Sequence, residues 1–182
     1  METTNLHPAL TVLDGLSSKP PVGKPNLLGF TRPELTTFVE EAGEKRFRAD
    51  QLFTALFEQK ISGFSEITTL SKTLRQALTD TFVISRPTID QVEASEDGTR
   101  KYRFVSVDGL AFEAVYIPQV AKGSRTNTLC VSSQTGCAVG CKFCFTASLR
   151  RNRNLAAAEI VGQVLAVQDD VTAEDEHARV TN

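Results

Sequence analysis

The sequence lacks the features that mark membrane-spanning, exported and disulfide-stabilised proteins. No stretch approaches the roughly 18 consecutive apolar residues of a transmembrane helix, so we expect none. Residues 1–16 show no basic segment followed by an apolar block, which predicts a cytoplasmic protein without a secretory signal. Four cysteines are too few for a disulfide framework in 182 residues, so reduced thiols with a metal-binding or catalytic role are expected.

An excess of charge of one sign is also lacking. The chain has 20 basic and 22 acidic residues, for a net charge of −2. Non-specific attraction of the whole molecule to nucleic acid is therefore not expected, and any such contact requires a local basic patch. With 41% apolar and 23% charged residues, the composition is that of an ordinary globular protein of one domain or two small ones.

The N-terminal part divides into an extension and a helical domain. Residues 1–27 are predicted to be a mobile, proline-rich extension, because the segment KPPVGKP cannot be helical. Residues 28–87 carry apolar side chains at helical spacing and predict a small helical domain. Its basic residues are either phosphate contacts or a solvated surface, and the sequence leaves both open: Lys45, Arg46, Arg48, Lys72, Arg75 and Arg86.

The helices of this domain have recognisable limits. Thr31 and Glu34 form a capping box, with Pro33 in the first turn, where its missing N–H costs little. Two further amphipathic segments predict helices over residues 49–60 and 70–82. The domain is thus expected to contain three helices.

The pattern then changes to alternation of polar and apolar residues. Residues 88–122 predict an antiparallel meander of three strands, with turns at Asp97-Gly98 and Asp108-Gly109. Within residues 123–182, a strand over 126–133, a cysteine-containing loop and a helix over 155–168 form one βα unit of a parallel sheet or barrel. The fold class expected is therefore α+β: a helical domain, a small antiparallel β meander, and the first βα unit of an incomplete (β/α) barrel.

All four cysteines lie within fifteen residues, and three of them form the motif Cys137-x3-Cys141-x2-Cys144. Three thiolates on a tight loop hold zinc or an iron–sulfur cluster. Structural zinc normally takes four ligands, and His7 and His177 lie far away in the sequence. A cluster held by three cysteines leaves one iron open for a substrate or cofactor. A zinc site, or three cysteines that merely pack in the core, are the alternatives.

This loop, with Phe143 just before the last cysteine, resembles the signature of radical S-adenosylmethionine (SAM) enzymes. The resemblance implies that Cys137, Cys141 and Cys144 hold a [4Fe–4S] cluster whose open iron binds SAM. It implies a place for Phe143 beside that cofactor. It also implies an electron donor, such as a flavodoxin-type protein, because one electron cleaves SAM to an adenosyl radical.

The wider sequence resembles the RlmN/Cfr family of adenosine methyltransferases. The segments that carry this likeness are EAVYIP, TLCVSSQTGCAVGCKFCFTA and NRNLAAAEIVGQV, and residues 46–82 resemble the RNA-binding domain of that family. The resemblance implies an enzyme that methylates an adenine ring carbon, C2, in 23S rRNA and, in some members, in tRNA. Such enzymes read exposed or flipped-out bases.

The family likeness also assigns roles outside the cluster. Glu113 matches the residue proposed to accept the ring proton, although a surface carboxylate is the alternative. Cys130 matches the cysteine thought to resolve a covalent protein–RNA intermediate, although it is otherwise expected to be a small core residue. Arg150, Arg151 and Arg153 form a basic patch that suits an RNA backbone or, alternatively, a solvated loop.

Two departures from the family pattern stand out. Phe145 follows the last cysteine, where many relatives carry a small residue. The sequence also stops at Asn182, before the family's GMGEP-like loop and its methyl-carrying cysteine. We therefore expect an N-terminal portion that is inactive alone. The alternatives are a short RNA-binding module with a vestigial cluster loop, or a zinc-binding interaction protein.

Overall fold

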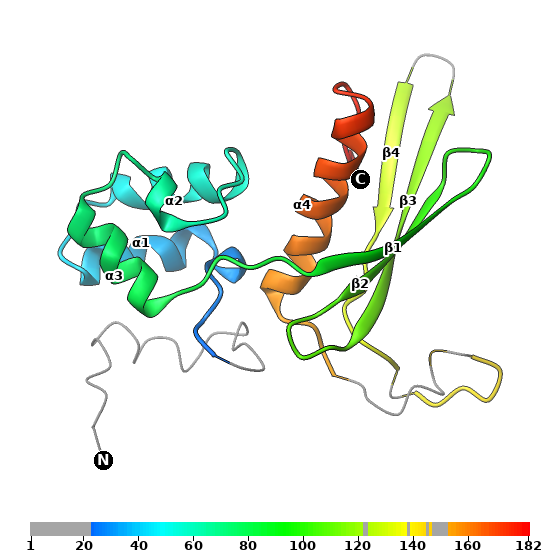
Figure 1. Ribbon diagram of the computed structural model, residues 1–182, viewed down its shortest axis with the longest axis horizontal. Helices are drawn as coiled ribbons and strands as arrows, with labels where there is room; N and C mark the ends of the chain where they lie inside the picture. The colour runs from blue at the N-terminus through cyan, green and yellow to red at the C-terminus, as the bar shows by residue number, and fades with distance from the viewer. Residues whose placement is uncertain (1–22, 122–123, 138, 145, 147–152) are drawn as a thin grey trace. The chain divides into compact units, whose positions relative to one another are not determined.

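The computed structural model describes residues 23–121, 124–137, 139–144, 146 and 153–182 (Figure 1). The chain divides into two compact units, Met1–Ser85 and Arg86–Asn182. Most of the predicted extension, residues 1–27, lies outside the described residues, which begin at residue 23. Among the residues that are described, no helix combines the length and the apolar character needed to cross a membrane.

The first unit is helical, as its periodicity predicts. Its described residues form two short 3-10 helices and three α-helices, in the order η2 (Leu27–Gly29), α1 (Arg32–Glu41), α2 (Phe47–Phe57), η3 (Phe64–Glu66) and α3 (Lys72–Thr81). The predicted start of α1 is confirmed: the Thr31 side chain accepts from the Glu34 N–H, and the Glu34 carboxylate accepts from the Thr31 N–H at 2.6 Å. This reciprocal pair satisfies two of the amide groups that a helix N-terminus leaves without a partner.

An aromatic cluster joins the two ends of this unit. Phe82, which follows α3, lies edge-on to Phe30 and Phe38, with ring centroids 5.4 and 4.8 Å away. Next to it, the Leu27 N–H donates to the Val83 carbonyl at 2.9 Å. All three phenylalanine rings are buried, so the residues just before α1 and just after α3 pack into the same core.

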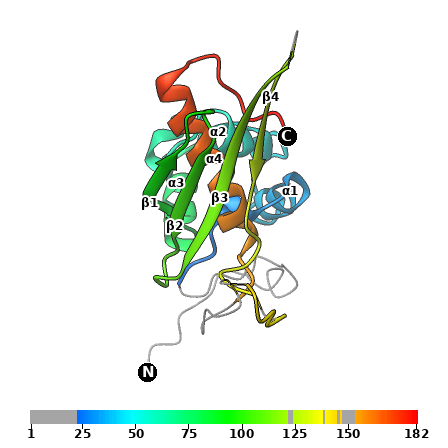
Figure 2. The same cartoon turned by 90° about the vertical axis from the view of Figure 1, so that its right-hand side faces the viewer.

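In the second unit, the described residues form an antiparallel sheet and one α-helix. Its strands follow one another in the order β1-β2-β3-β4, and α4 packs on one face (Figure 2). The element bounds are β1 (Thr88–Ala94), β2 (Arg100–Val105), β3 (Ala111–Ala121), β4 (Ser124–Cys130) and α4 (Ala157–Glu174). Helices and an antiparallel sheet together confirm the α+β class.

The structure adds a fourth strand to the predicted three-stranded meander. β4 pairs antiparallel with β3, from Ala121↔Ser124 to Val115↔Cys130, and so extends the same sheet. β3 is long enough to pair with both β2 and β4. β2 pairs with its first half, up to Tyr116, and β4 pairs with its second half, from Val115. Alternation of polar and apolar residues shows that a strand is half-buried, but it does not reveal the strand's partner.

The other edge of β4 carries the beginning of a parallel neighbour. The Thr181 N–H donates to the Asn127 carbonyl at 2.8 Å, and the Leu129 N–H donates to the Asn182 carbonyl at 2.8 Å. Both segments advance in the same direction through these bonds, which is the parallel arrangement. β4 and α4 are thus followed by a segment that runs parallel to β4, consistent with the predicted βα unit.

The sheet has one buried and one exposed face. The buried face packs against α4 through a core that contains Tyr102, Phe104, Phe112, Ala114, Tyr116, Leu129, Leu155, Val167 and Val171. Glu113 and Cys130, by contrast, point to the opposite face and are exposed. Because side chains alternate along a strand, burial of one set of residues fixes the other set on the exposed face.

Gly162 lies where α4 comes close to Pro87. A Cβ atom at this position of α4 would lie 2.5 Å from Cδ of Pro87, in a ring that cannot bend away. Gly162→Ala should therefore lower the free energy of unfolding by about 1–3 kcal/mol, the usual cost of overpacking. This outcome would run against the roughly 1 kcal/mol by which alanine exceeds glycine in helix propensity.

Urea denaturation of both variants and the parent chain measures the effect. The matched control is Gly63→Ala, where the nearest atom to an added Cβ is a flexible Glu66 side-chain oxygen at 3.6 Å. The control should change the unfolding free energy by no more than about 0.5 kcal/mol. A Gly162→Ala variant as stable as the parent would show that α4 does not approach Pro87 this closely.

Candidate functional site

The cysteine-containing segment between β4 and α4 starts and ends at a short antiparallel stem. The Leu155 N–H donates to the Ser133 carbonyl at 2.8 Å, and the Thr135 N–H donates to the Arg153 carbonyl at 3.0 Å. Between them, Gln134 and Asn154 form an isolated bridge, and their side-chain amides bond at 2.8 Å. We call residues 133–135 and 153–155 the stem. It brings together two segments that lie about twenty residues apart in the sequence.

The three predicted cluster ligands lie beyond the stem. Cys137, Cys141 and Cys144 are each half-buried, and the structure forms no disulfide among the four described cysteines. The Cys144 N–H donates to the Cys141 carbonyl at 3.1 Å, which closes the C-x2-C turn. Gly140 has a φ of +72°, a left-handed conformation that glycine adopts without strain.

The donor set fits an iron–sulfur cluster by its chemistry, because thiolates from closely spaced cysteines are the usual ligands of such clusters. Within the described part of the chain, however, no three potential ligand side chains converge on one metal position. The structure therefore places the three thiols on one short segment but does not assemble their sulfur atoms around a common point.

Glu113 lies on β3, close to the first residues of the cysteine segment. Its backbone carbonyl accepts a hydrogen bond from Ser132 Oγ at 2.6 Å. Its carboxylate points away from α4, is 57% exposed and lies 3.7 Å from Nζ of Lys101. Lys101 also binds Glu93 at 3.0 Å, and these carboxylates raise the pKa of the lysine, with the hydrogen bond to Glu93 contributing most.

Cys130 lies on the same face of the sheet as Glu113. It stands opposite Val115 in the β3–β4 register, two residues along β3 from Glu113. Side chains two residues apart on a strand share a face, so the two predicted catalytic residues are neighbours on the exposed face. The alternative that Cys130 is a buried core residue is wrong, because its neighbour Leu129 fills that place and Cys130 is exposed.

The remaining predicted residues have different surroundings. Phe143, the predicted cofactor contact, is 94% exposed. Arg150 and Arg151 lie outside the described residues. Arg153 is described, and its guanidinium binds two carboxylates, those of Asp108 and Glu159. The predicted role of Arg153 in an RNA-binding patch is therefore not supported by this geometry, because its charge is already balanced within the fold.

Sequence reasoning missed three residues around the stem. Asp108 was recognised only as part of a turn dipeptide, which the structure confirms through the φ of +76° at Gly109. Glu159 is the acidic residue at the start of α4, and Gln163 lies one turn later with a fully buried side chain. The other buried residues of α4 are apolar or glycine. A glutamine among them is the one sequence signal that could have revealed the role of Gln163.

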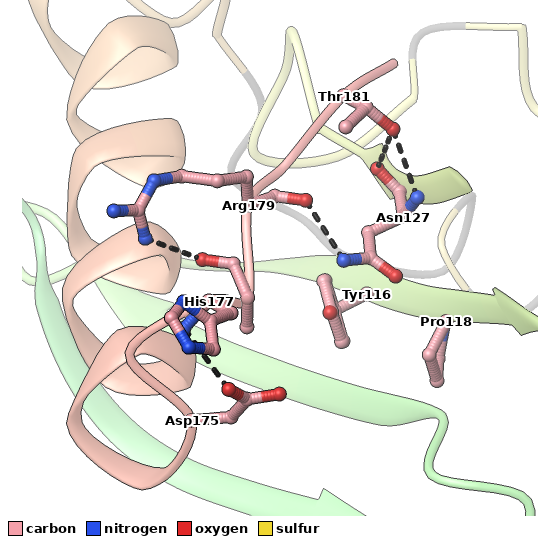
Figure 3. A pocket seen from close by; sticks show the side chains of 8 residues that line it. Tyr116, Pro118, Asn127, Asp175, His177, Arg179 and Thr181 are labelled. Atoms are coloured by element: carbon pink, nitrogen blue, oxygen red, sulfur yellow. Dashed lines mark hydrogen bonds between the residues drawn. The ribbon is translucent and has the colours of Figure 1, made fainter. Parts of the chain in front are cut away.

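A cavity of about 320 Å³ lies elsewhere in the second unit (Figure 3). It is lined by Tyr116, Pro118, Asn127, Asp175, His177, Ala178, Arg179 and Thr181. The Asn127 side chain donates to the Arg179 carbonyl at 2.8 Å across it. None of the predicted site residues that the structure describes lines this cavity.

Comparison with known proteins defines the class. Residues 25–84 match the ribosomal RNA large subunit methyltransferase N-terminal domain. The crystal structure of a radical SAM methyltransferase from Sphaerobacter thermophilus is similar with a TM-score of 0.69 and 35% identity, covering 86% of this chain and 45% of that one. The described fold is thus similar to part of a radical SAM methyltransferase.

Curated relatives identify the family. The dual-specificity RNA methyltransferase RlmN of Geotalea uraniireducens is 48% identical over 145 residues, which are 80% of this chain and 41% of the relative. RlmN of Geobacter sulfurreducens is 45% identical over 146 residues, or 80% of this chain and 39% of the relative. The chain belongs to the RlmN/Cfr family, and it spans about two fifths of the length of these relatives.

The Asp108–Arg153 pair makes stability depend on pH. Hydrogen bonds from Arg153 hold the pKa of Asp108 well below its ordinary value, although partial burial opposes the shift. A lowered pKa means that this stabilisation is complete above the ordinary aspartate value of about 4 and is lost as the pH falls toward the folded-state pKa. Asp108→Asn should cost about 1–3 kcal/mol of unfolding free energy at neutral pH.

Urea unfolding of the metal-free parent and variant tests this expectation. The difference in unfolding free energy between them should shrink as the pH is lowered from neutral to about 3. A difference that stays constant over this range would show that the Asp108 carboxylate is not held ionised by Arg153.

Proposed function

We propose that this chain forms the cluster-binding and RNA-binding portion of a radical SAM enzyme that methylates C2 of an adenine in 23S rRNA and in tRNA. The observation that carries the proposal is the placement of three thiols on the segment that leaves β4, beside the sheet face that presents Glu113 and Cys130. The name of these relatives, dual-specificity RNA methyltransferase, supports an RNA substrate of more than one kind.

The cofactors follow from the donor set and the family. Cys137, Cys141 and Cys144 would hold the [4Fe–4S] cluster, and SAM would bind at the iron that has no protein ligand. When bound, the two groups supply the radical chemistry that an adenine C2, which is not nucleophilic, requires. Phe143 offers an exposed ring next to the last ligand and is the proposed contact to SAM.

The residues of the sheet face handle the target base. The exposed carboxylate of Glu113 is the proposed acceptor of the ring proton, and Nζ of Lys101 lies 3.7 Å from it. The Cys130 thiol, exposed on the same face, is the proposed group that releases the product. Because α4, the one described helix of the second unit, packs on the other face, a flipped-out base could approach this face.

RNA contact outside the site is assigned to the first unit. At the start of α2, Phe47 is half exposed, and the Arg48 guanidinium lies 4.8 Å from the centre of its ring. Lys45 and Arg46, just before it, are exposed. Aromatic rings beside cations are typical of surfaces that bind unpaired RNA. Arg150 and Arg151 remain proposed backbone contacts, whereas Arg153 is not included.

These residues alone are proposed not to complete methyl transfer. The four cysteines of the sequence are all assigned, three to the cluster and Cys130 to product release, so none remains to carry the methyl group. An electron donor of the flavodoxin type is the proposed source of the electron that starts each reaction.

Metal analysis tests the cluster. After anaerobic reconstitution, the parent chain should hold about four iron and four sulfide per molecule. Cys137→Ala should lose most of this iron, because a cluster ligand is removed. The control Cys130→Ala removes a thiol from the sheet face and should retain the full iron content. Bound zinc in place of iron, or equal iron loss in both variants, would contradict the assignment.

Binding to an RNA oligonucleotide tests the first unit. Arg46→Ala should weaken binding and reduce the slope of log affinity against log salt by about one, as expected for a lost phosphate contact. The control is Arg32→Ala, which removes a cation that binds Asp50 at 2.5 Å and so offers little free charge. Equal effects of the two variants would count against a contact surface at the start of α2.

A further inference from the structure

Arg153 occupies the centre of an ion-pair cluster that joins three parts of the second unit. Its Nε and Nη2 donate to the two carboxylate oxygens of Asp108, at 2.7 and 2.8 Å. Its Nη1 and Nη2 donate to the two oxygens of Glu159, both at 2.8 Å. Asp108 lies in the β2–β3 turn, Arg153 at the end of the cysteine segment and Glu159 in the first turn of α4. We call these three residues the clamp.

The clamp is shielded from solvent and fully bonded. Its side chains are only 12–21% exposed, which strengthens each charged hydrogen bond compared with the same bond on a surface. Asp108 also accepts from Ser106 Oγ, and Glu159 accepts from the Ala156 N–H at 2.8 Å. A planar guanidinium is needed to bind two carboxylates side-on, and a lysine ammonium cannot reproduce that geometry.

The other end of the cysteine segment is held by Gln163. Its Oε1 accepts from the Ser132 N–H at 3.0 Å, and its Nε2 donates to the Ser132 carbonyl at 3.0 Å. The side-chain amide thus bonds the backbone as a neighbouring strand would, where β4 has already ended. Both ends of the segment are therefore fixed by side chains of α4, Gln163 at the start and Glu159, through Arg153, at the end.

We propose that Arg153 is a positioning residue for the cluster: the clamp, together with Gln163, fixes the stem and thereby holds the two ends of the cysteine segment together before the cluster binds. This inference rests on the proposed function, because it assumes that the cluster binds. The clamp itself is established by the hydrogen bonds of Arg153. Ordering a long segment costs conformational entropy, and a stem that is already closed removes part of that cost before the metal binds. Groups that orient metal ligands typically change metal affinity about 10–100-fold.

The test compares two ion pairs of the same unit. Arg153→Ala is matched by Arg100→Ala, which removes a guanidinium that is equally buried and that binds Asp170 and Glu174 at the other end of α4. Iron and sulfide content is measured after reconstitution and again after challenge with a chelator. Arg153→Ala should lose its iron about 10-fold more readily than the parent, as expected when ligand-orienting groups are removed. Arg100→Ala should retain iron like the parent, even if both variants unfold at lower temperature.

Two further variants separate positioning from folding. Arg153→Lys keeps the charge but not the paired geometry, so it should restore iron retention only in part. The double variant Asp108→Ala/Arg153→Ala should retain no less iron than Arg153→Ala, because both changes break the same interaction. If Arg153→Ala retains iron as well as Arg100→Ala, the clamp does not position the cluster.

Hydrogen exchange of the metal-free chain tests the clamp independently of any metal. The Thr135 and Leu155 amides, which donate across the stem, should lose protection in Arg153→Ala and keep it in Arg100→Ala. Should the parent chain take up no iron, the proposed function fails while this measurement still decides on the clamp. Unchanged protection in Arg153→Ala would overturn the inference.

Discussion

The second unit depends on the packing of α4 against one face of the four-stranded sheet. Tyr102, Phe104 and Phe112 stack in sequence across β2 and β3, with ring centroids 6.3 and 5.6 Å apart, and α4 covers them. Burial of aromatic area of this size is the main source of stability available to a unit of fewer than a hundred residues. It also commits the opposite face of the sheet to solvent, and the candidate catalytic side chains lie there.

The same helix organises the cysteine segment. Its first two turns provide Glu159 and Gln163, one for each end of the segment, while its later residues fill the core. The position of the stem is thus coupled to the packing of α4, so that a single rigid element supports both the fold and the site. Chemistry of this kind requires ligands held by groups that are themselves held in place.

The sequence predicted local features well, because short-range physical chemistry determines them. The capping box at Thr31 and the turn at Gly109 are properties of a few adjacent residues. The partners of Arg153 could not be predicted from the sequence, for the opposite reason. Its carboxylate partner Asp108 lies 45 residues earlier in the sequence, and nothing local to either residue indicates that they meet.

The sequence by itself determined the helical first unit, the class of the fold and the three-cysteine motif, since periodicity, caps and spacing are written in consecutive residues. Only the tertiary structure decided that β4 joins the meander, that Glu113 and Cys130 share an exposed face, and that Arg153 binds carboxylates. These outcomes depend on strand register and on contacts between distant segments. Such contacts are chosen by the packing of the whole unit, and a one-residue change in register would reverse the face on which Cys130 lies.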